Sequence, residues 1–328
     1  MPQSGSMPSF DFAIYGTGLL SGLLAGVLAG QYSRKVVRIG RRPSAQRLPR
    51  SLHLALPLAT HLESWRMVCK AEAETRSLLA SIGAEKAWSA TEVSVHGDSQ
   101  GTLAALDHIG HLAHAFNHQV RRLPGGWAFR YSPSLDAELL QDAIAAWLTS
   151  LDVETLDDDR LPDARLRVFP DDAALLEQIP APERPATLLP QAMTATLIAS
   201  PRALPTPIQR YPDRGVTLAT RPGNTVLALV SGEVDVEARL ASTLGGPFPI
   251  KRLATTRYRR LVTADGAPLT GRLKPSKLVV IAGLGDASAF FAPALARALI
   301  GESADDEKRW FADHDPSRPR QTVAEFVP

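Results

Sequence analysis

The sequence predicts an α/β protein in which a nucleotide-binding βαβ unit is combined with a domain built on an antiparallel sheet. Three observations carry this prediction. The chain opens with an apolar run, a glycine turn, an apolar helix and a second β-branched run, which is the order of a βαβ unit. A turn signal at residues 221–224 separates two strand-like runs. A third apolar run near the C-terminus again leads into a glycine turn.

The composition is that of a folded enzyme. The chain has 328 residues, of which 45% are hydrophobic and 21% charged, which is typical of a soluble globular protein of about two domains. Its 36 basic and 34 acidic residues give a net charge of +2, so a general attraction to nucleic acid is not expected. Cys69 is the only cysteine, which excludes an intramolecular disulfide and agrees with a cytoplasmic location.

The most apolar stretch runs from Leu19 to Gly30. It is well short of the ~20 residues that a helix needs to span a bilayer. Asp11 stands before it, where a secretory signal would carry basic residues. We therefore expect a buried helix and no membrane span.

The first strand and its turn have the pattern of a dinucleotide-binding site. Phe10 to Tyr15 is an apolar run typical of a buried parallel strand. It leads into Gly16-Thr17-Gly18, and Ser21 stands at the usual third glycine with Gly22 beside it. Glycines let backbone N–H groups approach a pyrophosphate at the helix N-terminus. The alternative is a glycine turn that only lets the helix pack closely.

The second strand, Lys35 to Ile39, ends at Gly40, where an acidic residue usually holds the adenosine ribose. Arg41 and Arg42 follow it and could stack on adenine or accept the 2′-phosphate of NADP. An NADP-dependent reductase is therefore an alternative function. The other interpretation of the two arginines is a solvated loop.

The middle of the chain alternates helices with strands. We expect two packed helices within 61–82, a strand at 88–96, an amphipathic helix at 103–120, a strand at 126–131 and a helix that begins near Asp136. Residues 152–207 give no clear periodicity. Arg-Pro-Gly-Asn at 221–224 predicts a β-hairpin between the runs at 215–219 and 225–230.

The C-terminal part carries a longer motif. It comprises Arg260 to Gly271, the apolar run Leu278 to Ala282, the turn Gly283-Leu284-Gly285-Asp286-Ala287-Ser288, and Ala292-Pro293 at the start of a helix. In order and spacing this resembles the C-terminal signature of the D-amino-acid oxidase and glycine oxidase family of flavoproteins. Together with the N-terminal motif, the resemblance includes segments near both ends of the chain.

The resemblance implies FAD as cofactor and oxidation of the amine carbon of a small amino acid or related amine. It implies that Gly283, Gly285, Asp286, Ala287 and Ser288 face the flavin ring, and that Arg260 binds the substrate carboxylate with two parallel hydrogen bonds. Tyr258 and His53 are further candidate site residues. Arg260 as a surface arginine, and Tyr258 and His53 as packing or solvent residues, are the alternatives.

The resemblance also implies a Rossmann-like FAD-binding domain at residues 9–87, 133–200 and 275–312, and a discontinuous antiparallel-sheet substrate domain at 88–132 and 201–274. Residues 313–328 are predicted to be a surface tail. A small-molecule substrate is expected as partner, and a protein partner or a second copy of the chain is left open.

The sequence departs from the family pattern. Leu261 replaces a proline, Leu284 replaces a histidine, Ser288 replaces a glycine, and the ribose acid is missing. The family's strand ending in Ala-x-Gly has no clear counterpart, although 195–200 or 187–189 are candidates. A non-catalytic scaffold or partner subunit that keeps the fold is therefore a further alternative.

Four histidines suggest a metal site. His108, His111, His114 and His118 are spaced by three, three and four residues, which would bring imidazoles together on one helix. They fall opposite the apolar positions, however, and so we expect a solvated face and no metal. Cys69 is expected to be a small buried side chain.

Overall fold

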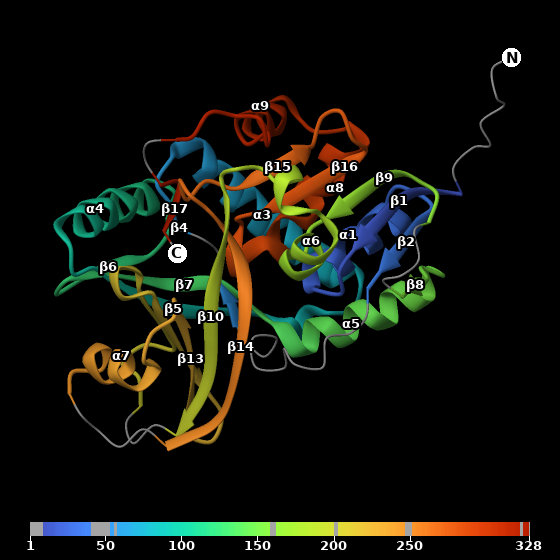
Figure 1. The fold of residues 1–328 in the computed structure, drawn as a ribbon. Coiled ribbons are helices and arrows are strands. Elements are labelled where there is room, and N and C mark those ends of the chain that lie inside the picture. The colour runs from blue at the N-terminus through green and yellow to red at the C-terminus, as the bar shows by residue number, and fades with distance from the viewer. Residues whose placement is uncertain are drawn as a thin grey trace, which may run out of the picture.

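The structure is a computed structural model that describes residues 9–40, 53–55, 58–157, 162–199, 203–246, 251–321 and 324–327. Two sheets organise the chain, and Figure 1 shows the smaller one, with its helices, beside the long strands of the larger one. The predicted α/β class is confirmed.

The smaller sheet has six strands in the order β15-β16-β9-β1-β2-β8. Their bounds are β1 Phe10–Tyr15, β2 Val36–Ile39, β8 Thr155–Leu156, β9 Ala164–Phe169, β15 Leu269–Arg272 and β16 Leu278–Ala282. All neighbouring pairs are parallel except β15 and β16. The two ends of the chain therefore meet in one sheet, with β9 between them.

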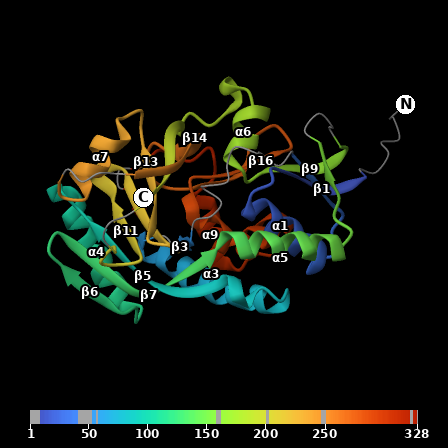
Figure 2. The ribbon, with the colours of Figure 1, turned by 90° about the horizontal axis from the view of Figure 1, so that it is seen from below.

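The predicted N-terminal helix is α1, Leu19–Gly30. It is buried on nearly all sides, and its glycines allow close packing against α5, Ala137–Ser150. A Cβ on Gly22 would lie 2.5 Å from Ile144 Cγ2, and one on Gly26 would lie 2.1 Å from the Trp147 ring. The two helices run side by side (Figure 2). Part of the glycine pattern thus serves helix packing.

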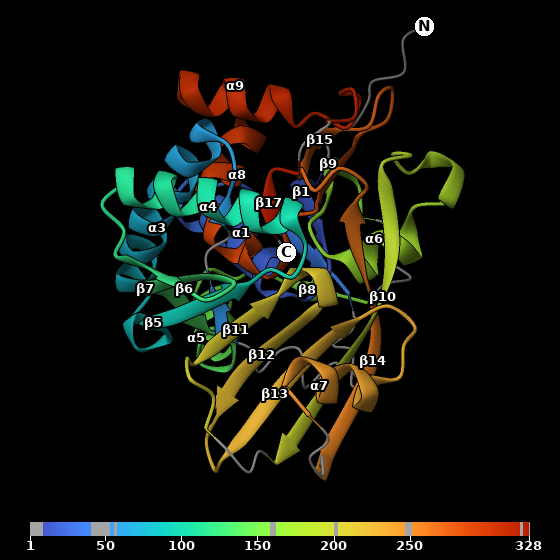
Figure 3. The same cartoon turned by 90° about the vertical axis from the view of Figure 1, so that its left-hand side faces the viewer.

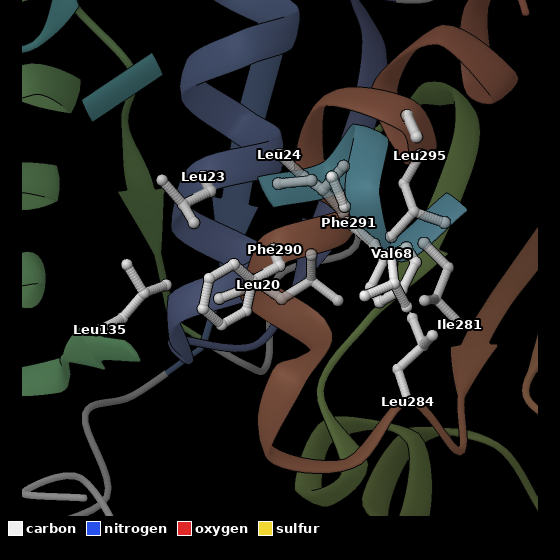
Figure 4. Close-up of a cluster of buried hydrophobic side chains, with 14 of the residues drawn as sticks. Leu20, Leu23, Leu24, Val68, Leu135, Ile281, Leu284, Phe290, Phe291 and Leu295 are labelled. Carbon is white, nitrogen blue, oxygen red and sulfur yellow. The ribbon is translucent and has the colours of Figure 1, made fainter. Parts of the chain in front are cut away.

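The main core lies between α1 and the helices α3, Leu62–Ser81, and α8, Ala292–Ile300. Figure 4 shows Leu20, Leu23 and Leu24 of α1 facing Phe290 and Phe291. Phe290 and Phe291 lie in the short 3-10 segment η4, Gly285–Phe291, which leads from the C-terminal glycine turn into α8. Burial of these side chains anchors that turn beside the start of α1.

The larger sheet has nine strands. Eight follow the order β14-β10-β13-β12-β11-β5-β7-β3, and β6 pairs with β7. Their bounds are β3 His53–Ala55, β5 Trp88–His96, β6 Val120–Leu123, β7 Gly126–Asp136, β10 Leu188–Ala199, β11 Ile208–Tyr211, β12 Val216–Arg221, β13 Thr225–Ser231 and β14 Lys251–Thr263. It is antiparallel except where β11 pairs with β5. The predicted hairpin is confirmed as β12 and β13.

Helix α7, Val236–Thr243, covers one face of this sheet (Figure 3). Its Leu240 packs with Ile198, Val216 and Val230 in a separate small core. Strands β10 and β14 are the longest, and their ends reach the smaller sheet, where Leu188 and Leu261 share a core with Phe169 and Ala282. The two sheets are thus connected through these two strands.

Several sequence expectations need correction. Residues 62–81 form one helix, where two were expected, because its charged residues are exposed or half-buried, and Lys70 and Glu74 pair with Glu307 and Arg297. Helix α4 spans Gln100–Ala115 and ends before His118, and residues 120–123 form β6. The strand beside β1 is β9, whereas the candidate segments 187–189 and 195–200 overlap β10 of the larger sheet.

The C-terminal segment 313–328 was predicted to be a surface tail, but His314, Glu325 and Phe326 are buried. Helix α9, Asp305–Asp313, leads into it, and its final strand β17, Phe326–Val327, pairs with β4, Leu58–Ala59. Glu325 accepts hydrogen bonds from Ser64 and bonds His314 Nε2 at 2.6 Å. The tail is therefore held by paired polar groups that composition does not reveal.

Four strands disagree with the domain boundaries drawn from the sequence. β3, within 9–87, and β10, within 133–200, belong to the larger sheet, β15, within 201–274, belongs to the smaller one, and β7 continues across the boundary at 132/133. The remaining boundaries stay a prediction. Within the described residues, no helix has both the length and the apolar character to cross a membrane.

Candidate functional site

The turn between β1 and α1 has the backbone that the sequence pattern predicts. Gly16 has φ +112°, a conformation that favours glycine. Gly18 is the N-cap residue of α1 and has no side chain to cap it. Ser21 is fully buried, and its hydroxyl has no hydrogen-bond partner among the described residues. The turn therefore leaves polar groups of α1 available to a neighbour.

That neighbour is Asp171, which follows the end of β9. Because β9 and β1 are adjacent and parallel, their carboxyl ends meet at one edge of the sheet. The Gly18 N–H donates to Asp171 Oδ2 at 3.1 Å. A Cβ on Gly16 would lie 2.2 Å from the Asp171 Cβ. The glycines of the first motif thus make room for a carboxylate of the same chain.

The C-terminal glycine turn lies at the same edge. Gly283 and Gly285 have φ +76° and +59°, and Leu284 between them is buried in the core. Asp286, Ala287 and Ser288 continue the turn as part of η4, and Ser288 is half-buried. Leu284, which stands where the family has a histidine, therefore serves packing.

Three adjoining cavities run along this edge. A central cavity of about 230 Å³ is lined by both glycine turns, including Gly18, Ser21, Gly283 and Gly285. It shares Thr17 to Leu19 with one of about 160 Å³ and shares Arg260 with one of about 270 Å³. Each is smaller than the usual range of about 300–1,000 Å³ for a ligand site. Together they outline an elongated cleft.

Arg260 lies between the central cavity and the adjoining one of about 270 Å³. It is half-buried on β14, opposite Gln191 of β10, and its Nε donates to Gln191 Oε1 at 2.8 Å. That bond orients the guanidinium group, and neither terminal nitrogen bonds another described residue. Tyr258, two residues earlier on the same face of the strand, also lines the central cavity. Arg260 is therefore held beside both glycine turns, and its contact with a substrate carboxylate stays a prediction.

The cavity of about 270 Å³ extends to β11. Its lining includes Arg210, which is buried, and Tyr211. The Tyr211 hydroxyl donates to Gln209 at 2.9 Å, and its ring stacks on His96 at 5.0 Å. Burial raises the pKa of Tyr211 and lowers the pKa of His96. This end of the cavity thus carries the Arg210 guanidinium and the Tyr211 phenol, and His96 stacks against Tyr211.

The structure does not place every predicted residue at the cleft, and two of them lie outside the described residues. The backbone of His53 lies in β3, paired with Asp136. Arg41 and Arg42 lie outside the described residues. His108, His111 and His114 are exposed on α4, whereas His118 lies beyond the helix, with Nε2 3.7 Å from Cys69 Sγ. No group of three or more potential ligands for a metal ion occurs among the residues that the structure describes.

The fit to a dinucleotide is incomplete. The positive φ of Gly16, the unpartnered Ser21 hydroxyl and the elongated cleft suit a cofactor with a pyrophosphate. The Gly18 N–H, however, is already bonded to a carboxylate. In this conformation the residues do not accommodate a pyrophosphate at the start of α1.

Sequence reasoning missed Asp171 and Gln191. Asp171 follows the strand Ala164–Phe169, and an Asp that caps a helix shortly after a short apolar run is a recognisable pattern. Gln191 has no local signal, because only the pairing of β10 with β14 brings it to Arg260.

Comparison with known proteins gives the fold. No protein-family model matches the chain, and no curated protein matches it in sequence. Glycine oxidase from Geobacillus kaustophilus superposes with a TM-score of 0.68 at 16% identity, over 92% of this chain and 95% of that one. L-Proline dehydrogenase from P. horikoshii superposes with a TM-score of 0.74 at 12% identity, over 94% of this chain and 97% of that one.

Iminodiacetate oxidase from Chelativorans sp. BNC1 gives a TM-score of 0.66 at 16% identity, over 90% of this chain and 96% of that one. At such identities the likeness establishes the fold. The resemblance inferred from the motifs is confirmed at that level, over nearly the whole length of the chain.

Proposed function

We propose that this chain is an FAD-dependent oxidoreductase that acts on the CH–NH group of a small amino acid or a related amine with a carboxylate. The observation that carries the proposal is the cleft in which Arg260 adjoins both glycine turns. The likeness to glycine oxidase, iminodiacetate oxidase and L-proline dehydrogenase supports it, since the names of all three describe oxidation of such compounds.

In this proposal the residues of the chain act mainly by positioning. FAD, when bound, supplies the electron acceptor. Arg260 binds the substrate carboxylate through its two terminal nitrogens, while Gln191 keeps its plane fixed. Tyr258 lies beside it in the central cavity. Fixing the carboxylate fixes the amine carbon at one place in the cleft, which is the main contribution that orientation makes to a rate.

One observation favours a second candidate function. Asp171 occupies the start of α1, where the cofactor's pyrophosphate would lie. A chain that keeps the fold without binding FAD, as a non-catalytic scaffold or partner subunit, would have this feature. Under the first proposal, Asp171 has to move when FAD binds.

The visible absorption spectrum of the purified protein separates the two candidates. A flavin band near ~450 nm supports the oxidoreductase, and a colourless protein that binds neither FAD nor NADP supports the scaffold. If NADP alone binds, the reductase alternative is supported.

Substrates are then found by anaerobic bleaching of the flavin with a panel of amino acids and amines. Arg260→Met should abolish bleaching by carboxylate substrates and leave the flavin bound. Arg257→Met is the matched control, because Arg257 is an exposed arginine on the same strand. Equal bleaching of the flavin in both variants would show that Arg260 does not bind the substrate carboxylate.

A further inference from the structure

We infer that Asp171 is a built-in competitor for the phosphate position at the N-terminus of α1, and that it sets the affinity of the chain for FAD. The inference rests on the proposed function, because it concerns the same site. It adds a residue that acts against cofactor binding, which the sequence pattern alone would not suggest.

The Asp171 carboxylate is held by three backbone N–H groups from two helices. Oδ2 accepts from Gly18 at the start of α1. Oδ1 accepts from Ala173 and Ala174 at 3.0 and 3.3 Å, and these open α6, Asp172–Gln178. An anion is favoured at the N-terminus of a helix, where N–H groups lack partners within the helix. The carboxylate therefore supplies what a phosphate would supply to Gly18.

The backbone around Asp171 holds it in this place. Its Cβ packs against Gly16, where an added Cβ would come within 2.2 Å. The next residue, Asp172, accepts a hydrogen bond from Leu261 N at 2.9 Å, which ties the turn to β14 close to Arg260. The turn after β9 is thus fixed on both sides, and only rotation of the Asp171 side chain would clear the position.

A pyrophosphate at this position would meet a like charge at hydrogen-bonding distance. Two like charges some 4 Å apart in a partly buried site repel each other strongly. Binding of FAD must therefore displace the carboxylate or tolerate the repulsion, and either weakens the complex. Removing the negative charge of residue 171 while keeping its cap on α6 should relieve this repulsion.

Asp171→Asn makes that change, because asparagine caps a helix about as well as aspartate does. Asp235→Asn is the matched control: Asp235 caps α7 with the same pattern of bonds, from the N–H groups of Glu237 and Ala238 at 3.0 and 3.2 Å, at an exposed position on the larger sheet. Asp172→Asn removes a charge from the same turn without touching Gly18. Thermal unfolding followed by circular dichroism verifies that each variant is folded.

The experiment is a titration of each purified protein with FAD, followed by quenching of flavin fluorescence after any carried-over flavin has been removed. We expect Asp171→Asn to bind FAD roughly tenfold to a hundredfold more tightly than the wild type. Asp235→Asn should leave Kd unchanged, and Asp172→Asn should change it less than Asp171→Asn does.

The outcomes separate this inference from the proposed function. If the wild type does not bind FAD and Asp171→Asn does, the inference is supported and the native chain is not an FAD enzyme. If both bind with equal affinity, the proposed cofactor stands and the inference is wrong. If Asp171→Asn binds more weakly than the wild type, or if neither protein binds, Asp171 is not what limits binding and the inference is overturned.

Discussion

Replacing Asp265 by asparagine should strongly destabilise the fold. Asp265 belongs to the C-terminal motif, yet its side chain is fully buried and pairs with Arg318. Oδ2 lies 2.5 Å from Nη1, and Oδ1 lies 2.9 Å from Nη2. Backbone N–H groups of Ala267 and Gln321 complete the site at 3.3 and 2.9 Å. This part of the motif therefore holds the tail.

The expected loss of stability follows from the charge of Arg318, which the substitution leaves unpaired. Removing one partner of a buried ion pair leaves an uncompensated guanidinium, which costs about 3–5 kcal/mol. An independent route gives a similar value. The hydrogen bonds from Arg318, Gln321 and Ala267 lower the pKa of Asp265 from 3.8 to about 2, against the opposing effect of burial. That shift is worth roughly 2–3 kcal/mol at neutral pH.

The sign of the pH dependence follows from this shift. The pKa of Asp265 is lower in the folded protein than in the unfolded chain, so the carboxylate stabilises the fold above about pH 4. This contribution is lost as the pH falls from about 4 to 2. Asp265→Asn, which has no carboxylate there, should lack this part of the acid sensitivity.

Urea unfolding followed by tryptophan fluorescence measures the effect at pH 7 and at several values down to pH 3. We expect Asp265→Asn to lose about 3 kcal/mol at pH 7. Asp305→Asn is the control, because Asp305 is 94% exposed and its pairing with Lys308 is a surface contact. A loss under about 1 kcal/mol for Asp265→Asn would refute the reasoning, since breaking a buried pair costs more.

Two further predictions concern packing and the thiol. Gly26→Ala should lower the free energy of unfolding in urea by about 1–3 kcal/mol, because its Cβ would overlap the Trp147 ring. Gly101→Ala, whose Cβ meets no atom within 4 Å, should raise that free energy by up to about 1 kcal/mol. Equal effects of the two substitutions would contradict this account. Burial, and secondarily Glu72, raises the pKa of the Cys69 thiol, so Cys69 should react with a disulfide reagent at pH 7 more slowly than free cysteine. A rate equal to that of free cysteine would show that the thiol is accessible.

The local elements of the glycine motifs were predictable. The apolar run Phe10–Tyr15, the glycine turn and helix Leu19–Gly30 were expected from the sequence and occur with those bounds. Strand Trp88–His96 and the hairpin were expected as well. Each of these has a signal within a few residues, in periodicity, in a turn or in a glycine with positive φ.

The strand beside β1 was not predictable. The run Ala164–Phe169 lacks the Ala-x-Gly ending that was sought, and its role as the neighbour of β1 depends on pairing with two strands distant in sequence. The buried tail was missed for the same reason. Arg318 and Glu325 are polar and indicate surface, but Arg318 pairs with Asp265 and Glu325 accepts a hydrogen bond from Ser64, both far along the chain.

The sequence by itself determined the α/β class and the two glycine turns, since these depend on local periodicity and on the conformational freedom of glycine. Arg260 was expected only from the resemblance to the oxidase family. Only the tertiary structure decided what the glycines at the start of α1 approach. Parallel pairing of β9 with β1 brings Asp171 to the Gly18 N–H. A glycine pattern records that a close approach is needed there, but the approaching group comes from a distant strand, because contacts across a sheet are set by strand order.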